Sequence, residues 1–211
     1  SVSNTYTWTQ DDTGPTMTIT SSSVTSGATT GTEAVALTFT SNEATTDFIA
    51  SDITASSCAL SSLTGSSSTV YTATCTPADG ATASVSVAAG EFSDAVSNTN
   101  SVSNTYTWTY DGTGPTMAIT SATVDSGSST ATAAIALTFT SNEATSDFAQ
   151  ADITETGCSL GTFAATSSTV YTDTCTASSD GTPTIVVAAG AFNDAVGNDN
   201  SASNTYTWTY D

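Results

Sequence analysis

Polar and apolar residues alternate with a period of two along most of the chain, and helical periodicity is nearly absent. In such an alternation, successive side chains point to opposite faces of a β-strand, so one face can be buried while the other meets solvent. The apolar positions expected to share buried faces in the first hundred residues are Met17, Ile19, Val35, Leu37, Phe39, Tyr71, Ala73, Cys75, Val85 and Val87. The pattern predicts antiparallel sheets with one wet face each.

Segments rich in Gly, Ser, Asn and Asp separate these runs and leave about seven short strands per hundred residues, which is typical of an immunoglobulin-like sandwich. We expect strands near residues 16–24, 33–41, 46–50, 53–60, 68–77, 82–89 and 101–110. The predicted fold class is all-β, with two tandem immunoglobulin-like β-sandwich domains.

The chain repeats itself after 100 residues. Residues 1–100 and 101–200 align without a gap, and direct comparison gives 61 identical positions. A unit of this size can bury its own core. The segment SVSNTYTWT of residues 1–9 returns at 101–109 and, with Ala202 in place of Val102, at 201–209. Within one unit this segment is expected to be the last strand.

This phasing divides the chain into complete units at 11–110 and 111–211, preceded by residues 1–10. Two interpretations of residues 1–10 stay open. The chain is a window on a longer array, or the segment is a strand donated to the sheet of a neighbouring molecule. In both, the apolar face formed by Tyr6 and Trp8 needs a partner. The start inside a repeat is expected of a mature product or a piece of a longer protein.

Charge narrows the classes of partner. The chain has no Lys, Arg or His and a formal charge of −20, and Ser and Thr make up 82 of its 211 residues. It therefore cannot neutralise phosphates, which excludes nucleic acid as a partner, and anionic membranes would repel it. No segment approaches the roughly 20 apolar residues of a membrane helix. The expected partners are further copies of the chain or adjacent repeats.

Four cysteines recur with the same spacing in each repeat, at positions 58 and 75 and at positions 158 and 175. We expect one disulfide per repeat, Cys58–Cys75 and Cys158–Cys175, with a hairpin centred near residues 65–67 that sets Cys58 opposite Cys75. Zinc is the weaker alternative, because no His is available and each repeat offers only two thiols. Disulfides indicate an oxidising, extracellular setting.

The acidic residues are expected to gather at one pole of each sandwich. There the entry segment, the loop after the second strand and the loop before the last strand should meet. The residues that these loops carry are Asp11, Asp12, Glu43, Asp94 and Asn98 in one unit, and Asp111, Glu143, Asp194 and Asn198 in the other. No basic residue can neutralise them, and oxygen ligands of this kind suit calcium. The alternative is a solvated acidic rim of turn-forming residues. Asp47 and Asp52 are expected to cap local turns.

Four segments in order resemble the bacterial immunoglobulin-like repeats of large extracellular surface and biofilm adhesins: DDTGPTMTIT, ALTFTSNEATTDFIASDI, STVYTATCTP and VSVAAGEFSDAVSNTN. The second unit carries counterparts of all four. The resemblance implies an extracellular role as a tandem stalk or spacer, with calcium at domain junctions. The paired cysteines and the total absence of Lys and Arg depart from the usual pattern of that family.

Enzymatic chemistry finds little support, because no His or Lys can act as a general base and Ser has no base partner. We therefore predict a structural, non-catalytic module of a fibre or adhesin stalk. One alternative is a glycan-binding module in which Tyr106, Trp108 and Tyr110 stack on sugar rings, and its rival is that these rings fill the core. Another is a filament subunit that polymerises by strand donation through residues 1–10.

Overall fold

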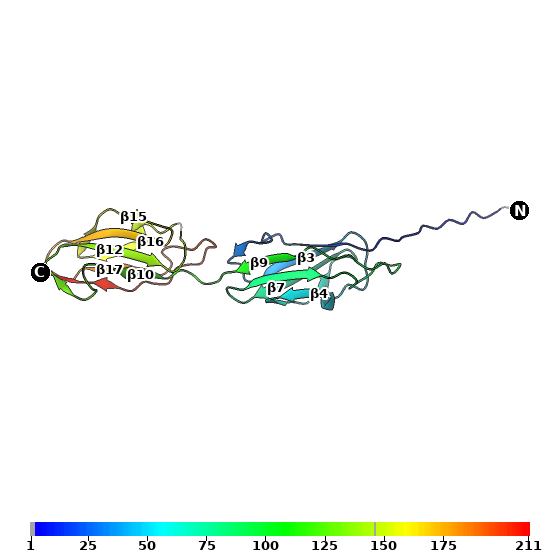
Figure 1. Ribbon diagram of the computed structural model, residues 1–211, viewed down its shortest axis with the longest axis horizontal. Helices are drawn as coiled ribbons and strands as arrows, with labels where there is room; N and C mark the ends of the chain where they lie inside the picture. Colours follow the sequence, from blue (N-terminus) through cyan, green and yellow to red (C-terminus); the bar gives the residue numbers. More distant parts are fainter. Residues whose placement is uncertain (1–2, 146) are drawn as a thin grey trace. The chain divides into compact units, whose positions relative to one another are not determined.

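The computed structural model describes residues 3–145 and 147–211. The chain forms two compact units, Ser1–Gly112 and Thr113–Asp211. Strands make up nearly all of the regular structure in both, with two 3-10 turns, η1 (Ala50–Asp52) and η2 (Gln150–Asp152) (Figure 1). No helix in the described residues is long and apolar enough to span a membrane. The predicted all-β fold class is confirmed.

The first unit packs two sheets around one core. One sheet has the order β1-β3-β7-β5, with β6 also paired to β7, and the other has the order β2-β9-β8-β4. All pairings are antiparallel except β2 with β9, which is parallel. The strands of the first sheet are β1 (Met17–Thr20), β3 (Val35–Ser41), β5 (Cys58–Leu60), β6 (Thr64–Gly65) and β7 (Val70–Pro77). Those of the second sheet are β2 (Thr29–Thr30), β4 (Ile53–Ser56), β8 (Thr82–Val87) and β9 (Tyr106–Tyr110).

The second unit repeats this plan with a broken closing strand. Its first sheet has the order β10-β12-β16-β14, with β15 paired to β16, and the rest forms a β13-β17-β18 sheet and a β11-β19 pair. The first sheet comprises β10 (Met117–Thr120), β12 (Ala134–Ser141), β14 (Cys158–Leu160), β15 (Ala164–Ala165) and β16 (Val170–Ala177). The other strands are β11 (Ser129–Thr130), β13 (Ile153–Thr156), β17 (Thr184–Val187), β18 (Tyr206–Thr207) and β19 (Thr209–Tyr210).

A proline explains the break. In the first unit, Ala83 of β8 pairs with Trp108 of β9. The second unit has Pro183 at the position of Ala83. Proline has no N–H to donate to a ladder. As a result β17 begins only at Thr184, and the closing strand is interrupted at Trp208.

Some expected strand positions are wrong. Residues 46–50 form no strand and lead into η1. Residues 53–60 are two strands in different sheets, because Ser57 adopts a left-handed backbone with φ 57°, as Gly157 does with φ 75° in the second unit. A left-handed residue ends an extended run. The chain crosses from one sheet to the other at this residue. The last strand starts at Tyr106 rather than at residue 101.

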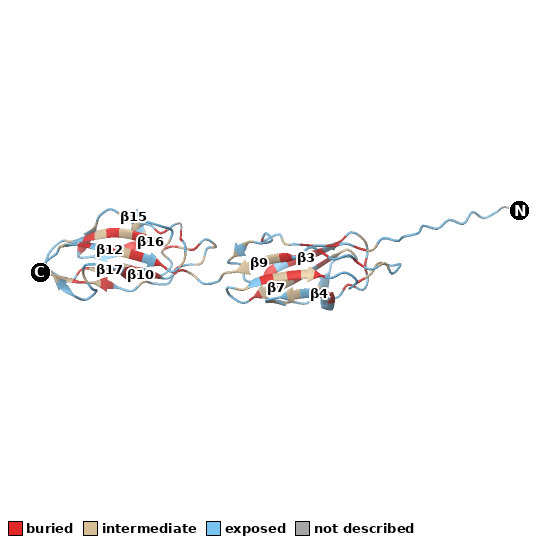
Figure 2. Cartoon of the chain, viewed as in Figure 1, coloured by how far each residue is buried: buried red, intermediate tan, exposed pale blue. Residues whose placement is uncertain are grey.

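The core follows the predicted alternation, with buried residues spaced along β3, β7, β12 and β16 (Figure 2). All ten apolar positions expected to face inward in the first unit are buried. Loop residues complete the core: the ring of Phe48 lies 5.0 Å from those of Tyr71 and Phe92, in edge-on contacts. Such contacts add to the stabilisation from area burial.

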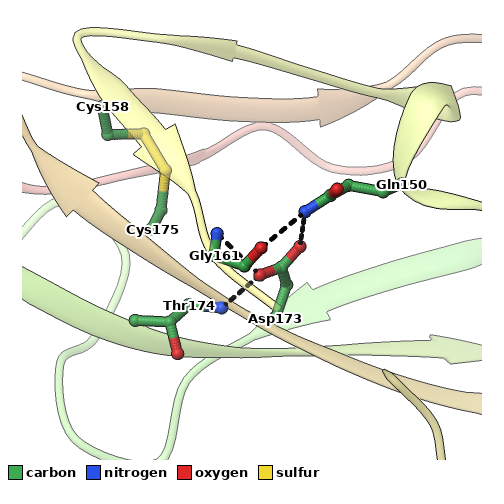
Figure 3. The surroundings of a disulfide bond; sticks show 6 residues. All are labelled: Gln150, Cys158, Gly161, Asp173, Thr174 and Cys175. Atoms are coloured by element: carbon green, nitrogen blue, oxygen red, sulfur yellow. Dashed lines mark hydrogen bonds between the residues drawn. A yellow bond between two sulfur atoms is a disulfide. The ribbon is translucent and has the colours of Figure 1, made fainter. Parts of the chain in front are cut away.

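Each unit contains its expected disulfide, Cys58–Cys75 and Cys158–Cys175, and Figure 3 shows the second. The predicted register is wrong by two residues, because Cys58 lies opposite Pro77 and Cys75 lies opposite Leu60. The bond therefore runs diagonally from β5 to β7, with Cα atoms 5.6 Å apart. The registers of β5 and β6 against β7 differ by one residue, so the hairpin is not an even ladder about its centre.

Candidate metal centre

Asp94 is held by the loop that it begins. Its Oδ1 accepts hydrogen bonds of 2.9 Å from the backbone N–H groups of Val96 and Asn98, and its Oδ2 accepts one of 2.9 Å from Asn98 Nδ2. Desolvation acts to raise the pKa of Asp94, but the hydrogen bonds from Asn98, Val96 and Ser97 outweigh it and lower this pKa below its ordinary value. The carboxylate is therefore charged at neutral pH and fixed in direction.

Asn98 joins this loop to the entry segment. Its Nδ2 also donates to the backbone carbonyl of Asp11 at 2.9 Å, and Asp11 Oδ1 accepts from the backbone N–H of Thr13 at 3.1 Å. Gly14 allows the close approach, because a Cβ there would lie 1.9 Å from the carbonyl oxygen of Thr99. The TGPT motif thus brings Asp11 beside the loop of Asp94.

Glu43 lies in the loop that follows β3, the third segment at this pole. The preceding residue, Asn42, exchanges hydrogen bonds with Thr16: Asn42 Oδ1 accepts from the backbone N–H of Thr16 at 2.6 Å, and the backbone N–H of Asn42 donates to the Thr16 carbonyl at 3.1 Å. One carboxylate oxygen each from Asp11, Glu43 and Asp94 lies within 4.8 Å of the other two. The three loops meet as the topology predicts, and their role in binding metal stays a prediction.

Two residues at this pole have other partners. Among the described residues, the three-carboxylate group leaves out Asp12, whose two oxygens accept hydrogen bonds from Gln10 Nε2 at 2.9 and 2.8 Å. Asn100 is buried, and its Oδ1 accepts from the backbone N–H groups of Glu91 and Phe92 at 2.8 and 3.0 Å. Asn100 therefore stabilises the backbone of the loop at Glu91 and Phe92 from a buried position.

The second unit builds the same loop around Asp194. Asp194 Oδ1 accepts from the backbone N–H of Val196 and Asn198 at 2.9 Å, and its Oδ2 accepts from Asn198 Nδ2 at 2.8 Å. Burial acts to raise the pKa of Asp194, and these hydrogen bonds lower it below its ordinary value. Glu143 follows β12 as Glu43 follows β3. Asp111, the counterpart of Asp11, belongs to the first compact unit, where its N–H donates to the Thr30 carbonyl at 3.0 Å.

Asp52 caps a local turn as expected, whereas Asp47 bonds within its own loop and also to a second loop. Asp52 Oδ2 accepts from the backbone N–H of Ile49 at 2.8 Å, at the start of η1. Asp47 accepts from the Thr45 hydroxyl at 2.8 Å and from the Ser93 hydroxyl at 2.7 Å, and so ties two loops together. Desolvation acts to raise the pKa of Asp47, but the hydrogen bonds from Ser93 and Thr45 lower it overall.

The three-carboxylate group has the dimensions of a site for one ion. Oxygens that bind a single calcium ion at about 2.4 Å lie at most about 4.8 Å apart. The chain contains no Lys, Arg or His that could neutralise the group instead. Uncompensated carboxylates at such distances repel one another. A hard divalent cation would relieve this repulsion.

Two of the three aromatic residues that were candidates for glycan stacking lie in the core. Trp108 is fully buried and Tyr106 nearly so, and only Tyr110 of the three is partly exposed. Trp208 and Tyr206 are buried in the same way. The prediction that these rings fill the core is confirmed for Tyr106 and Trp108, so the three residues do not form an exposed row on which sugar rings could stack.

Asp173 is a polar site that the sequence reasoning missed. It is 3% exposed, lies on the same face of β16 as Tyr171 and Cys175, and accepts a hydrogen bond of 3.0 Å from the backbone N–H of Gly161 (Figure 3). Gln150 Nε2 donates to its other oxygen at 2.7 Å. The signal was available, because the alternation of VYTDTCT places an acid at a core position where the first repeat has Ala73.

Comparison with known proteins gives one matching family and several solved structures of low sequence identity. A family model described as bacterial Ig-like domain matches residues 11–110 and 111–210. Yersinia pseudotuberculosis InvD is similar in structure, with 17% identity and a TM-score of 0.41, over 93% of this chain and 57% of that one. The Yersinia pseudotuberculosis adhesin InvE gives 17% identity and a TM-score of 0.34, over 93% of this chain and 58% of that one.

A Bacteroides ovatus glucan utilization protein, SGBP-B, solved in complex with a mixed-linkage heptasaccharide, gives 17% identity and a TM-score of 0.27, over 90% of this chain and 45% of that one. The chain thus spans little more than half the length of the Yersinia structures. No curated protein sequence matches the chain significantly.

Proposed function

Because the chain belongs to the bacterial Ig-like domain family, we propose that it is a non-catalytic structural segment of an extracellular adhesin stalk. The observation that carries the proposal is the tandem repetition of a complete sandwich with its own closing strand and its own disulfide. Each such module adds a fixed length to the stalk and keeps that length when the stalk is pulled. Their partners are the adjacent repeats.

Each unit is suited to bear load by itself. In the first unit, tension enters near β1, which is paired along its length with β3, and leaves through β9, which lies between β2 and β8. At least one of these ladders must break before the unit extends. The disulfide then keeps residues between Cys58 and Cys75 out of the extended length, since a covalent bond closes that loop.

Force spectroscopy on residues 1–211 held at both ends tests the stalk role. Two separate unfolding events are expected, one per sandwich. Reduction of the disulfides should lengthen each event by the extended length of about 16 residues, roughly 55 Å at about 3.4 Å per residue. Extension without discrete events would contradict the proposal.

We further propose that the acidic pole of each repeat binds one calcium ion, and that the ion stiffens the pole where the entry segment meets the two loops. The support comes from the three carboxylates of Asp11, Glu43 and Asp94, which lie at single-ion distances with no cationic side chain in the chain. The carboxylates supply hard oxygen ligands, and the loop hydrogen bonds of Asp94 hold one of them in place.

Thermal melts with calcium and with a chelator test this second proposal, together with calorimetric titration of calcium. A ligand that binds the folded state alone raises its stability. Glu43→Gln should abolish the calcium-dependent rise in the melting temperature of the first unit. Glu33→Gln, at an exposed position outside the three-carboxylate group, should leave that rise intact. The same melting temperature with calcium and with chelator would rule out calcium and leave the stalk proposal standing.

A further inference from the structure

The closing strand of the first unit, β9, is an inner strand of its sheet. β9 lies between β8 and β2. Its Tyr106 is opposite Val85 of β8, and its Thr109 is opposite Thr29 of β2. Trp108 is fully buried, and Tyr106 places its ring in the core while its hydroxyl donates to the carbonyl of Val24. The strand therefore fills a groove between two others.

Two polar residues before the strand add side-chain contacts. The Oδ1 atom of Asn104 accepts from the backbone N–H of Ile19 at 2.7 Å, and its Nδ2 donates to the carbonyl of the same residue at 2.9 Å. The Ser103 hydroxyl accepts from the backbone N–H of Val87 at 2.9 Å. Asn104 thus satisfies both backbone groups of Ile19 in place of another strand.

The second unit uses the same four groups. The backbone of Ile119 is paired with Asn204 at 2.8 and 3.0 Å, and Ser203 accepts from the backbone N–H of Val187 at 2.9 Å. The Tyr206 hydroxyl donates to the carbonyl of Val124, and Trp208 is fully buried. The four groups therefore define what a closing strand of this repeat requires.

Residues 3–10 carry every one of these groups. They supply Ser3, Asn4, Tyr6 and Trp8 in the same spacing. Yet the segment forms no strand, and its two rings are 84% and 77% exposed, where the equivalent rings of both units are buried. In the strand conformation of its counterparts, the segment would turn its threonines to solvent. Its two large rings would then form an apolar face that nothing covers.

We propose that residues 3–10 are a complete closing strand for a further sandwich of this same repeat. They enter the groove between the strands equivalent to β2 and β8 of that sandwich, antiparallel to the latter, with Asn4 on the backbone of the residue equivalent to Ile19. Both such grooves of residues 1–211 are filled by the chain's own strands. The inference rests on strand geometry, and neither the stalk role nor calcium is needed for it.

An acceptor can be made within the full chain. Tyr206→Ser/Trp208→Ser removes the two rings that hold the closing strand of the second unit and so opens its groove to residues 3–10 of another copy. In sedimentation velocity, this variant should form head-to-tail oligomers whose size increases with concentration, while the unaltered chain should not. The matched control adds Tyr6→Ser/Trp8→Ser to the acceptor variant, and oligomers should then disappear.

A second measurement does not depend on how well the acceptor variant folds alone. The unaltered chain, which has a free donor segment and filled grooves, is mixed with the acceptor variant that carries Tyr6→Ser/Trp8→Ser. Hydrogen exchange at residues 3–10 of the unaltered chain should slow by about 100-fold or more on mixing, because the amides become bonded in a sheet. If these amides exchange equally fast with and without the partner, and the acceptor variant sediments identically with and without its own Tyr6 and Trp8, the proposal is overturned.

Discussion

Asp173 and Gln150 form a hydrogen bond of 2.7 Å that joins the inner face of β16 to η2 in the second sandwich (Figure 3). The first repeat has alanine at both positions, Ala73 and Ala50. The pair is therefore an addition to a core that is complete without it. A buried carboxylate is tolerated only while its oxygens are hydrogen-bonded.

We expect Gln150→Ala to lower the free energy of unfolding of the second unit by about 1–3 kcal/mol, because it leaves a buried carboxylate oxygen without that donor. Asp173→Ala with Gln150→Ala recreates the arrangement of the first repeat and should recover most of the loss. Urea unfolding of the two variants and of Asp173→Ala alone completes the cycle. Additive losses in the double variant would show that the two residues act independently.

Asn104 offers a test with an internal control. Asn104→Ala leaves the N–H and the carbonyl of Ile19 without their side-chain partner, so we expect the first unit to lose about 1–3 kcal/mol. Asn4→Ala, the same change in the same sequence context, should have no measurable effect on the stability of residues 1–211, because Asn4 is exposed. Equal effects in thermal melts would contradict the assigned role of Asn104.

The alternation of polar and apolar residues predicted the sheets and the core because burial on one face of a strand leaves a direct trace in the sequence. It did not locate the break at Ser57, although the alternation changes phase there: Ile53 and Ala55 are the more buried positions of β4, and Cys58 and Leu60 are those of β5. A phase change across two serines is a weak signal, because it reads equally well as one irregular strand. The carboxylates of Asp11, Glu43 and Asp94 could be brought together from topology alone. Asp12 could not be told from Asp11, because the difference depends on a hydrogen bond with Gln10.

The disulfides should contribute more than any single hydrogen bond. Closing a loop of about 18 residues is worth about 3 kcal/mol in the chain-entropy model. We expect Cys58→Ser/Cys75→Ser to lower the free energy of unfolding of the first unit by about this amount and to leave the second unit unchanged. Cys158→Ser/Cys175→Ser serves as the reciprocal control. Hydrogen exchange in denaturant, read at the amides of β3 for the first unit and of β12 for the second, would show a loss in both units if the bonds were coupled.

Acid should weaken the tie that Asp47 makes between two loops. Hydrogen bonds from Ser93 and Thr45 lower the pKa of Asp47 in the folded state against desolvation, which acts to raise it. An aspartate in the unfolded chain has a pKa of about 3.9. A carboxyl whose folded pKa is the lower one stabilises the fold above the unfolded pKa, and this contribution is lost as pH falls through the folded value.

The advantage of the unaltered chain over Asp47→Asn should therefore be constant above about pH 5 and shrink as pH falls below about 4. The comparison is needed because the chain carries a charge of −20, so acid also relieves general repulsion in both proteins. Ser93→Ala removes one hydroxyl that donates to Asp47. In that background, the stability difference between the chain with Asp47 and its Asp47→Asn variant should be smaller and should shrink with falling pH in the same direction. Urea unfolding at pH values from 2 to 7 measures the difference, and a gap that stays constant down to pH 2 would show that Asp47 is not held by these hydrogen bonds.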